Sequence, residues 1–288
     1  MKRAYFYALL AVLLWSSVAT AFKLTLKQIS VVTLLFYSIL TSLIFLFAIL
    51  YKNKKLKKLF LLSKREYLYL LFLGFLNPFI YYIFLFKAYS YLPAQEAQAI
   101  NYTWALILTF LSAIILKQKI KTIDFIASFI AYFGVLIIAT HGNLASLEFG
   151  SLKGVFFALL STIFWAVYWI YSVKIKIDSS VAMFFTFLSG FIFLLFYIFL
   201  FDIELKTNLK GLIGSIYIGI FEMSLTFLIW LKALRLSLNN AKIANLIFLS
   251  PFISLIFIHL FLKEKILLST IVGLLLIIFA LILQQLKR

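Results

Sequence analysis

The sequence predicts an all-α membrane protein with ten transmembrane helices, arranged as two inverted five-helix repeats around a central cavity. Three observations predict it: the composition, the length of the apolar runs and an internal repeat. Of the 288 residues, 65% are hydrophobic and 12% are charged, whereas soluble domains are about half apolar and about a quarter charged. Apolar runs such as residues 31–51 have the length of about 20 residues that a spanning helix needs, and they lack the alternation of a barrel strand.

The apolar runs predict ten spans, joined by short connections that leave no room for a separate extramembrane domain. The N-terminal segment with Ala19-Thr20-Ala21 also fits a cleaved signal peptide, but we expect a retained first helix because the second half of the chain contains a counterpart. The predicted spans are residues 4–22, 31–51, 68–86, 94–116, 123–140, 154–173, 181–201, 211–231, 243–262 and 266–283.

The basic residues between the spans predict the orientation. If the N-terminus is cytoplasmic, 19 of the 27 Lys and Arg residues fall on the cytoplasmic side, in agreement with the positive-inside rule. We therefore expect a multi-pass protein of the inner (cytoplasmic) membrane with both termini in the cytoplasm. The run from Lys52 to Lys58 has two interpretations: a topology signal that also touches headgroups, or a specific site for anionic lipid.

The formal charge of +18 does not indicate a nucleic-acid binder, because the basic residues are spread over short connections between apolar runs. The chain has no cysteine, which excludes disulfides and thiolate metal sites. It contains no phosphate-binding loop, no H-E-x-x-H and no G-x-S-x-G motif. We therefore expect a protein that is not an enzyme and has no catalytic residues, metal site or cofactor. Its partners would be the bilayer and a small-molecule substrate, with the protein a monomer or weak homodimer.

An internal repeat relates residues 1–141 to residues 150–288. The matches run in order along both halves at shifts of 145 to 150 residues, and one of them places Trp15 on Trp165. Because each half has five spans, an odd number, the second half enters the membrane in the opposite sense, and such carriers bind substrate near the midplane. The other matches are Ala8–Leu10 with Ala158–Leu160, Gly74 with Gly219, Lys87-Ala88 with Lys232-Ala233, and Leu116–Ile120 with Leu262–Ile266.

Two halves of five spans, each with an L-K-x-K-I segment after the fourth span, resemble the drug/metabolite transporter (DMT) superfamily and its EamA-domain family. The segment containing Asn101, Tyr102 and Trp104 is similar to the N-Y-L-W-P stretch of the aromatic amino acid exporter branch. Here Thr103 replaces the leucine and Ala105 replaces the proline, while Pro251 aligns with Ala105 in the second half. The resemblance implies a ten-helix inner-membrane carrier that exports amino acids or other small metabolites by alternating access.

Glu222 and Asn77 are the leading candidates for a polar substrate site. An ionisable group in the middle of the eighth span is costly and rarely faces lipid, so Glu222 is a candidate coupling residue as well as a substrate-binding one. Asn77 occupies the repeat-equivalent position, and Pro78 beside it predicts a broken third span. The alternative for both is a hydrogen bond between helices that serves only packing.

Aromatic and amide side chains complete the expected cavity lining, although interfacial or packing roles are the alternative. We expect Glu96, near the outer end of the fourth span, to be a solvated loop charge; a gate salt bridge with Lys87 is the alternative. The full set of candidate substrate-binding residues is Trp15, Asn77, Tyr82, Asn101, Trp104, Trp165, Trp169, Glu222 and Asn245.

These patterns favour a secondary transporter that moves small organic metabolites, with amino acids first, across the cytoplasmic membrane, in the direction of export. Two alternatives stay open. A passive facilitator or channel would show no saturation, and a lipid flippase would have a lateral opening toward lipid.

Overall fold

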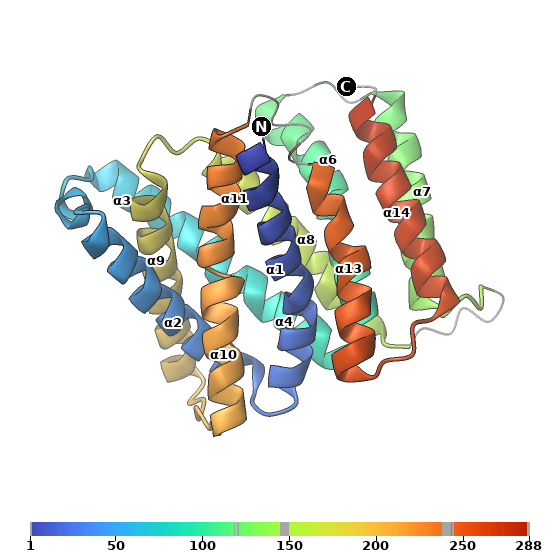
Figure 1. Cartoon of the computed structure of the whole chain (residues 1–288), viewed down its shortest axis with the longest axis horizontal. Helices are drawn as coiled ribbons and strands as arrows, with labels where there is room; N and C mark the ends of the chain where they lie inside the picture. The colour runs from blue at the N-terminus through green and yellow to red at the C-terminus, as the bar shows by residue number, and fades with distance from the viewer. Residues whose placement is uncertain are drawn as a thin grey trace. The chain divides into compact units, whose positions relative to one another are not determined.

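The computed structural model of the chain is entirely helical in the part that it describes, residues 2–117, 119, 121–144, 150–237, 243 and 245–286 (Figure 1). Eight helices are long and apolar enough to cross a membrane, and two shorter apolar helices follow them. The ten-span prediction is therefore confirmed, and the observed helix ends lie within five residues of the predicted ones. The hydrophobic length of each, near 30 Å of rise for about 20 residues, matches a bilayer.

The first half of the chain forms seven α-helices and two short helices of other types. They are α1 (Lys2–Leu26), α2 (Val31–Lys52), the 3₁₀ helix η1 (Leu56–Phe60), α3 (Lys64–Gly74), the π-helix η2 (Phe75–Ile80), α4 (Tyr81–Tyr91), α5 (Ala94–Asn101), α6 (Trp104–Leu116) and α7 (Thr122–Ala139).

In its described part, the second half of the chain forms six α-helices and two short helices of other types. Its elements are α8 (Leu152–Ser172), α9 (Ser179–Leu200), α10 (Leu209–Phe221), α11 (Leu225–Arg235), the 3₁₀ helix η3 (Asn245–Leu249), α13 (Ser250–Phe257), the π-helix η4 (Ile258–Leu262) and α14 (Leu268–Leu286).

The helices gather into two compact units, and each unit takes helices from both halves of the sequence. Unit 1 contains residues 1–83 and 175–262, and unit 2 contains residues 84–174 and 263–288. The boundary at Ile83 falls inside α4, so the helix begins in unit 1 and ends in unit 2.

Helix pairing within the units is reciprocal between the two halves. In unit 1, the first helix of the first half, α1, packs on α13 from the fourth span of the second half. In unit 2, the first helix of the second half, α8, packs on α5 and α6 from the fourth span of the first half. The same exchange relates α2 with α10 to α9 with α3. The fifth helices of both halves, α7 and α14, lie side by side in unit 2 (Figure 1).

Small residues allow the closest of these helix contacts, as is common between membrane helices. A Cβ atom added to Gly134 on α7 would lie 2.6 Å from the carbonyl oxygen of Gly273 on α14, so the two backbones touch. In unit 1, a Cβ atom on Gly190 of α9 would lie 2.5 Å from Cδ of Pro78 and 2.9 Å from the carbonyl oxygen of Gly74. These glycines therefore set how closely α9 approaches the third span.

The connection between α2 and α3 packs on unit 1 instead of extending away from it. Leu59 is buried in a cluster with Leu50 and Val181. Lys55 Nζ lies 2.8 Å from Oδ2 of Asp178, the residue that caps the N-terminus of α9. Partial burial alone would raise the pKa of Asp178, but hydrogen bonds from Lys55 and Ser180 and the charge of Lys55 lower the pKa to about 2.

Gly190→Ala should destabilise the protein by about 1–3 kcal/mol, because the added methyl group overpacks a contact with proline and backbone atoms that cannot move aside. Thermal unfolding in detergent, followed by tryptophan fluorescence, measures the loss. Ile192→Ala on the same helix is the control, since Ile192 is 52% exposed. An unchanged unfolding temperature for Gly190→Ala would contradict the assigned contact.

The ionised Asp178 should stabilise the fold in a defined pH range. Because its pKa is lower in the folded chain, this stabilisation is complete above its ordinary value of 3.8 and is lost as the pH falls toward about 2. Asp178→Asn should lower the unfolding temperature at pH 6 and flatten its dependence on pH between about 4 and about 2. Asp202→Asn, an exposed acid in another connection, should leave that dependence intact.

Candidate functional site

The eighth span is broken at Glu222, between α10 and α11. Residues 222–224 form a turn, and Ser224 has φ −136° and ψ −75°. Two side chains complete the hydrogen bonding that the break interrupts: Ser224 Oγ donates to the carbonyl oxygen of Gly219 at 2.8 Å, and the Thr226 hydroxyl donates to that of Phe221. Backbone groups inside a bilayer need such partners. The sequence predicted an unbroken span here because no proline marks the position.

The third span is broken at Asn77, as its neighbour Pro78 predicted. Asn77 has φ −149° and ψ 122° inside the π-helix η2, so its backbone is extended where the flanking residues are helical. The side chain is 2% exposed, and its Oδ1 accepts no hydrogen bond from any residue that the structure describes. A buried acceptor without a partner can accept a hydrogen bond from a donor outside the chain.

Asn77 and Glu222 are 145 residues apart, the shift predicted for Gly74 and Gly219. The break in the eighth span covers residues 222–224, so the two spans that the sequence predicts to be repeat-related are both interrupted near the predicted position. Glu222 accepts a hydrogen bond from Tyr82, whose Oη lies 3.0 Å from Oε1. Tyr82 is fully buried at the start of α4, five residues after Asn77. No hydrogen bond joins Asn77 to Glu222 in the part of the chain that the structure describes.

Three of the predicted aromatic residues form one cluster in unit 2. The ring of Trp169 stacks on that of Trp104, with the ring centroids 6.4 Å apart, and meets the ring of Trp165 edge-on, with the centroids 5.8 Å apart. Asn101, next to this cluster in sequence, donates from Nδ2 to Ser161 Oγ at 3.0 Å. The Trp169 Nε1 group is buried and has no acceptor among the described residues, although a buried indole N–H usually has one.

The remaining candidates lie in unit 1. Trp15 packs against Phe227 and Trp230, with ring centroids 5.3 Å and 5.6 Å away. The predicted repeat relates Trp15 to Trp165 but does not predict that they touch. Each of the two packs against different aromatic residues. Asn245 begins η3, but its side chain lies outside the described part of the structure.

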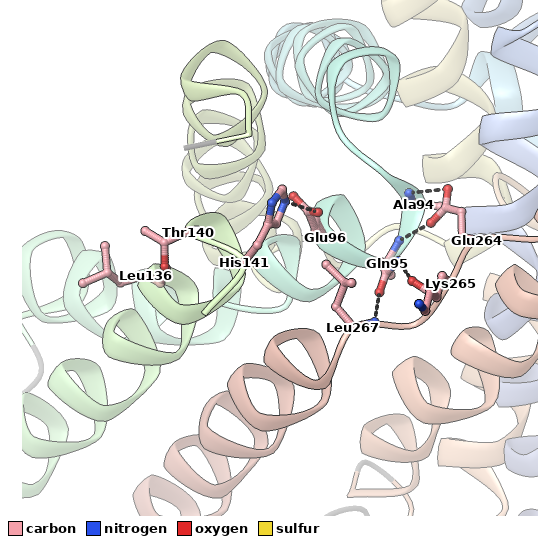
Figure 2. Close-up of polar contacts among 9 residues, drawn as sticks. All are labelled: Ala94, Gln95, Glu96, Leu136, Thr140, His141, Glu264, Lys265 and Leu267. Carbon is pink, nitrogen blue, oxygen red and sulfur yellow. Dashed lines mark hydrogen bonds and ion pairs between the residues drawn. The ribbon is translucent and has the colours of Figure 1, made fainter. Parts of the chain in front are cut away.

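Glu96 corrects a prediction. It is not a solvated loop charge: its side chain is 1% exposed, and Oε1 lies 2.9 Å from Nε2 of His141, which follows α7 (Figure 2). The expected alternative partner, Lys87, lies over the ring of Phe157 at 5.3 Å instead. Sequence reasoning missed His141 because the ends of α5 and α7 are far apart along the chain.

Glu264 caps the helix that carries Glu96. The backbone N–H groups of Ala94 and Gln95 at the N-terminus of α5 donate to its carboxylate at 3.0 and 3.5 Å. Pro93 at the N-cap position supplies no side-chain bond, so a carboxylate from the loop before α14 takes that role. Gln95 strengthens the connection, with Nε2 bonded to the carbonyl oxygen of Lys265 and Oε1 to the N–H of Leu267 (Figure 2).

A groove of about 600 Å³ lies in unit 1 between the C-terminal half of α1, α10 and the end of α13 with η4. None of the nine predicted substrate-binding residues lines it. Its polar wall includes Ser17 and Tyr217, whose hydroxyl oxygens lie 2.5 Å apart, and Thr20, whose buried hydroxyl has no partner among the described residues. The volume lies within the range of small-molecule sites. Within the described ranges, no three His, Asp or Glu side chains come close enough to hold a metal ion.

Comparison with known proteins agrees with this architecture. The chain is 26% identical over 263 residues to an uncharacterized transporter of Archaeoglobus fulgidus, covering 89% of this chain and 88% of the relative. It is also 26% identical over 291 residues to an uncharacterized transporter of Clostridium kluyveri, with 96% and 91% covered.

A protein of known crystal structure has the same fold, with a TM-score of 0.65 over the full length of both chains at 17% sequence identity. The model of the EamA-like transporter family matches twice, over residues 2–140 and residues 152–284. Because the two matches together cover nearly the whole chain, the protein belongs to the EamA-like transporter family.

Proposed function

We propose that this family member is a secondary carrier that exports small organic metabolites, with amino acids as the first class, by alternating access. Two inverted repeats, residues 1–141 and 150–288, would bind the solute near the bilayer midplane, with both chain termini in the cytoplasm. The reciprocal helix pairing supports the repeats, because a pseudo-two-fold axis exchanges equivalent helices in that way.

The observation that carries the proposal is the pair of helix breaks at Asn77 and Glu222. Broken spans in secondary transporters present free backbone and polar groups to substrate at the depth where repeats meet. Here each break also carries a polar side chain: an amide with an unoccupied acceptor, and a carboxylate held by Tyr82. We assign Glu222 to the amine of the substrate or to a coupled proton, and Asn77 to a polar group of the solute. We also propose Trp15 in unit 1, and Asn101, Trp104, Trp165 and Trp169 in unit 2, as solute-contacting residues.

Counterflow in proteoliposomes tests this function. Vesicles loaded with an unlabelled amino acid should accumulate the labelled one faster than empty vesicles, with saturation at high concentration. Nucleosides and sugars serve as the other solute classes in the same assay. Flux that neither saturates nor responds to internal solute would indicate a passive facilitator instead.

The groove of unit 1 favours a second candidate function, a flippase for lipids or other amphiphiles. It combines hydroxyl groups with apolar side chains such as Phe257 and Phe261, which would suit a molecule with a polar head and an apolar tail. Movement of a fluorescent lipid between leaflets of the same vesicles, without competition from amino acids, would support this candidate over the carrier of soluble metabolites.

Glu222→Gln should reduce the transport rate by about 10- to 100-fold and remove its dependence on pH, because hydrogen bonds to a charged group contribute about 1.5–3 kcal/mol. Tyr82→Phe should reduce the rate about fivefold, since it removes one hydrogen bond of about 1 kcal/mol and keeps the ring. Glu204→Gln, at an exposed position, is the matched control. Normal transport by Glu222→Gln across a range of pH would remove Glu222 from the mechanism.

Trp169→Phe should weaken substrate binding severalfold, because the unpartnered Nε1–H is lost and a smaller phenyl ring replaces the indole. Thermal stabilisation of the purified protein by substrate reports the affinity. Trp230→Phe makes the same change outside this cluster and should leave the affinity unaltered. Equal effects of the two substitutions would mean that the Trp169 N–H does not contact the solute.

A further inference from the structure

The connection between α2 and α3, residues 52–65, carries seven basic residues and only a few acidic neighbours; we refer to it as the basic loop. The two helices that it joins are both membrane-spanning, so the loop lies at the membrane surface. One side of the loop packs against unit 1, which we call its inner side, and the opposite, outer side is exposed. Leu56, Leu59 and Leu62 recur every three residues, which is the period of a 3₁₀ helix, and they pack into the cluster with Leu50 and Val181.

The outer side of the basic loop combines apolar and cationic side chains. Phe60 is 83% exposed and Leu61 is 76% exposed, and Tyr51 at the preceding helix end is 70% exposed. Aromatic and aliphatic groups beside lysines are the pattern of segments that lie in the interface of a bilayer. In water, such exposure of large apolar side chains would be unfavourable.

The acidic groups near the basic loop are already engaged. Oδ2 of Asp178 lies 2.8 Å from Nζ of Lys55 and 3.9 Å from Nζ of Lys58. Glu66 accepts hydrogen bonds from the backbone N–H and the hydroxyl of Ser63. The other basic side chains are exposed and have no acidic partner among the residues that the structure describes: Lys52, Lys54, Lys57, Lys64 and Arg65.

Lys64 and Arg65 also lie where helix electrostatics disfavour them. They occupy the first turn of α3, where the helix dipole stabilises anions and opposes cations. Glu66, in the same turn, already places an anion at this helix end through its capping box with Ser63. Lys64 and Arg65 themselves are exposed cations without an acidic partner among the described residues, so they are available to an anion outside the chain.

We propose that the basic loop is a docking surface for anionic phospholipid headgroups, with Phe60 and Leu61 inserted between the acyl chains. Lys52, Lys54, Lys57, Lys64 and Arg65 contact the phosphates. The internal ion pair of Lys55 with Asp178 holds the loop against unit 1, so that these side chains face the leaflet. The adjoining leaflet is the partner that this combination of exposed apolar and cationic groups fits.

A single-cysteine reporter tests the proposal, because the chain has no cysteine of its own. Phe60→Cys, labelled with a polarity-sensitive fluorophore, is placed in nanodiscs of phosphatidylcholine with increasing phosphatidylglycerol. The emission should shift to the blue as phosphatidylglycerol increases, and added salt should weaken the shift because it screens the charges. An identical spectrum in both lipids would overturn the proposal.

Charge variants identify the residues responsible. Each basic residue near an anionic surface strengthens binding about fivefold, so combining Lys57→Gln, Lys64→Gln and Arg65→Gln should raise the phosphatidylglycerol needed for half of the shift at least about tenfold. The matched control combines Lys27→Gln, Lys153→Gln and Lys210→Gln, exposed positions in another connection and in the first turns of α8 and α10. Equal behaviour of the two triple variants would contradict the assignment of these residues. An equal emission shift on adding inorganic phosphate or RNA, in place of phosphatidylglycerol, would contradict the assignment of the lipid as the partner.

Discussion

The structure depends on one constraint: inside a bilayer, a backbone hydrogen bond that is broken must be replaced from within the protein. Most of the described spans satisfy it with regular helical hydrogen bonds, and the third and eighth spans do so around a break. At Glu222 the replacement comes from the hydroxyls of Ser224 and Thr226. At the third span the break coincides with Pro78, which has no N–H to satisfy. Polar side chains can therefore sit at these two points without disrupting the surrounding helices.

The same constraint links fold to function. A chain that binds a polar solute within the membrane needs polar groups there, and isolated ones are costly. Glu222 is not isolated, because Tyr82 donates to it, whereas the Asn77 oxygen and the Trp169 N–H have no partner among the described residues. An unpartnered group of this kind is available to a ligand, which is the basis for proposing Asn77 and Trp169 as site residues; Glu222 is proposed because its carboxylate lies at the break in the eighth span. Paired groups such as Ser42 with Ser224 are assigned to packing.

Much of the fold could be predicted from the sequence because hydrophobic length and repeat spacing are local or periodic signals. The ten spans followed from them, and the break at Asn77 followed from its neighbour Pro78. The break at Glu222 did not, since its cause is a pair of hydroxyl side chains instead of a proline. Glu96 and His141 show a second limit of reasoning from sequence. Their contact joins residues 45 positions apart, and nothing in the local sequence indicates that the Glu96 side chain is buried. The groove of unit 1 was also missed, because its volume depends on how three elements pack and not on any motif.

The contact of Gly134 with Gly273 limits how the fifth helices of the two halves can move. With backbone against backbone at this crossing, and the side chains of Ile138, Leu276 and Ile277 packed around it, α7 and α14 cannot roll over one another without losing van der Waals contact there. They would travel as a single rod. In the proposed alternating-access cycle the rearrangement would then fall on other elements, and the breaks in the third and eighth spans are places where the regular helix is already interrupted.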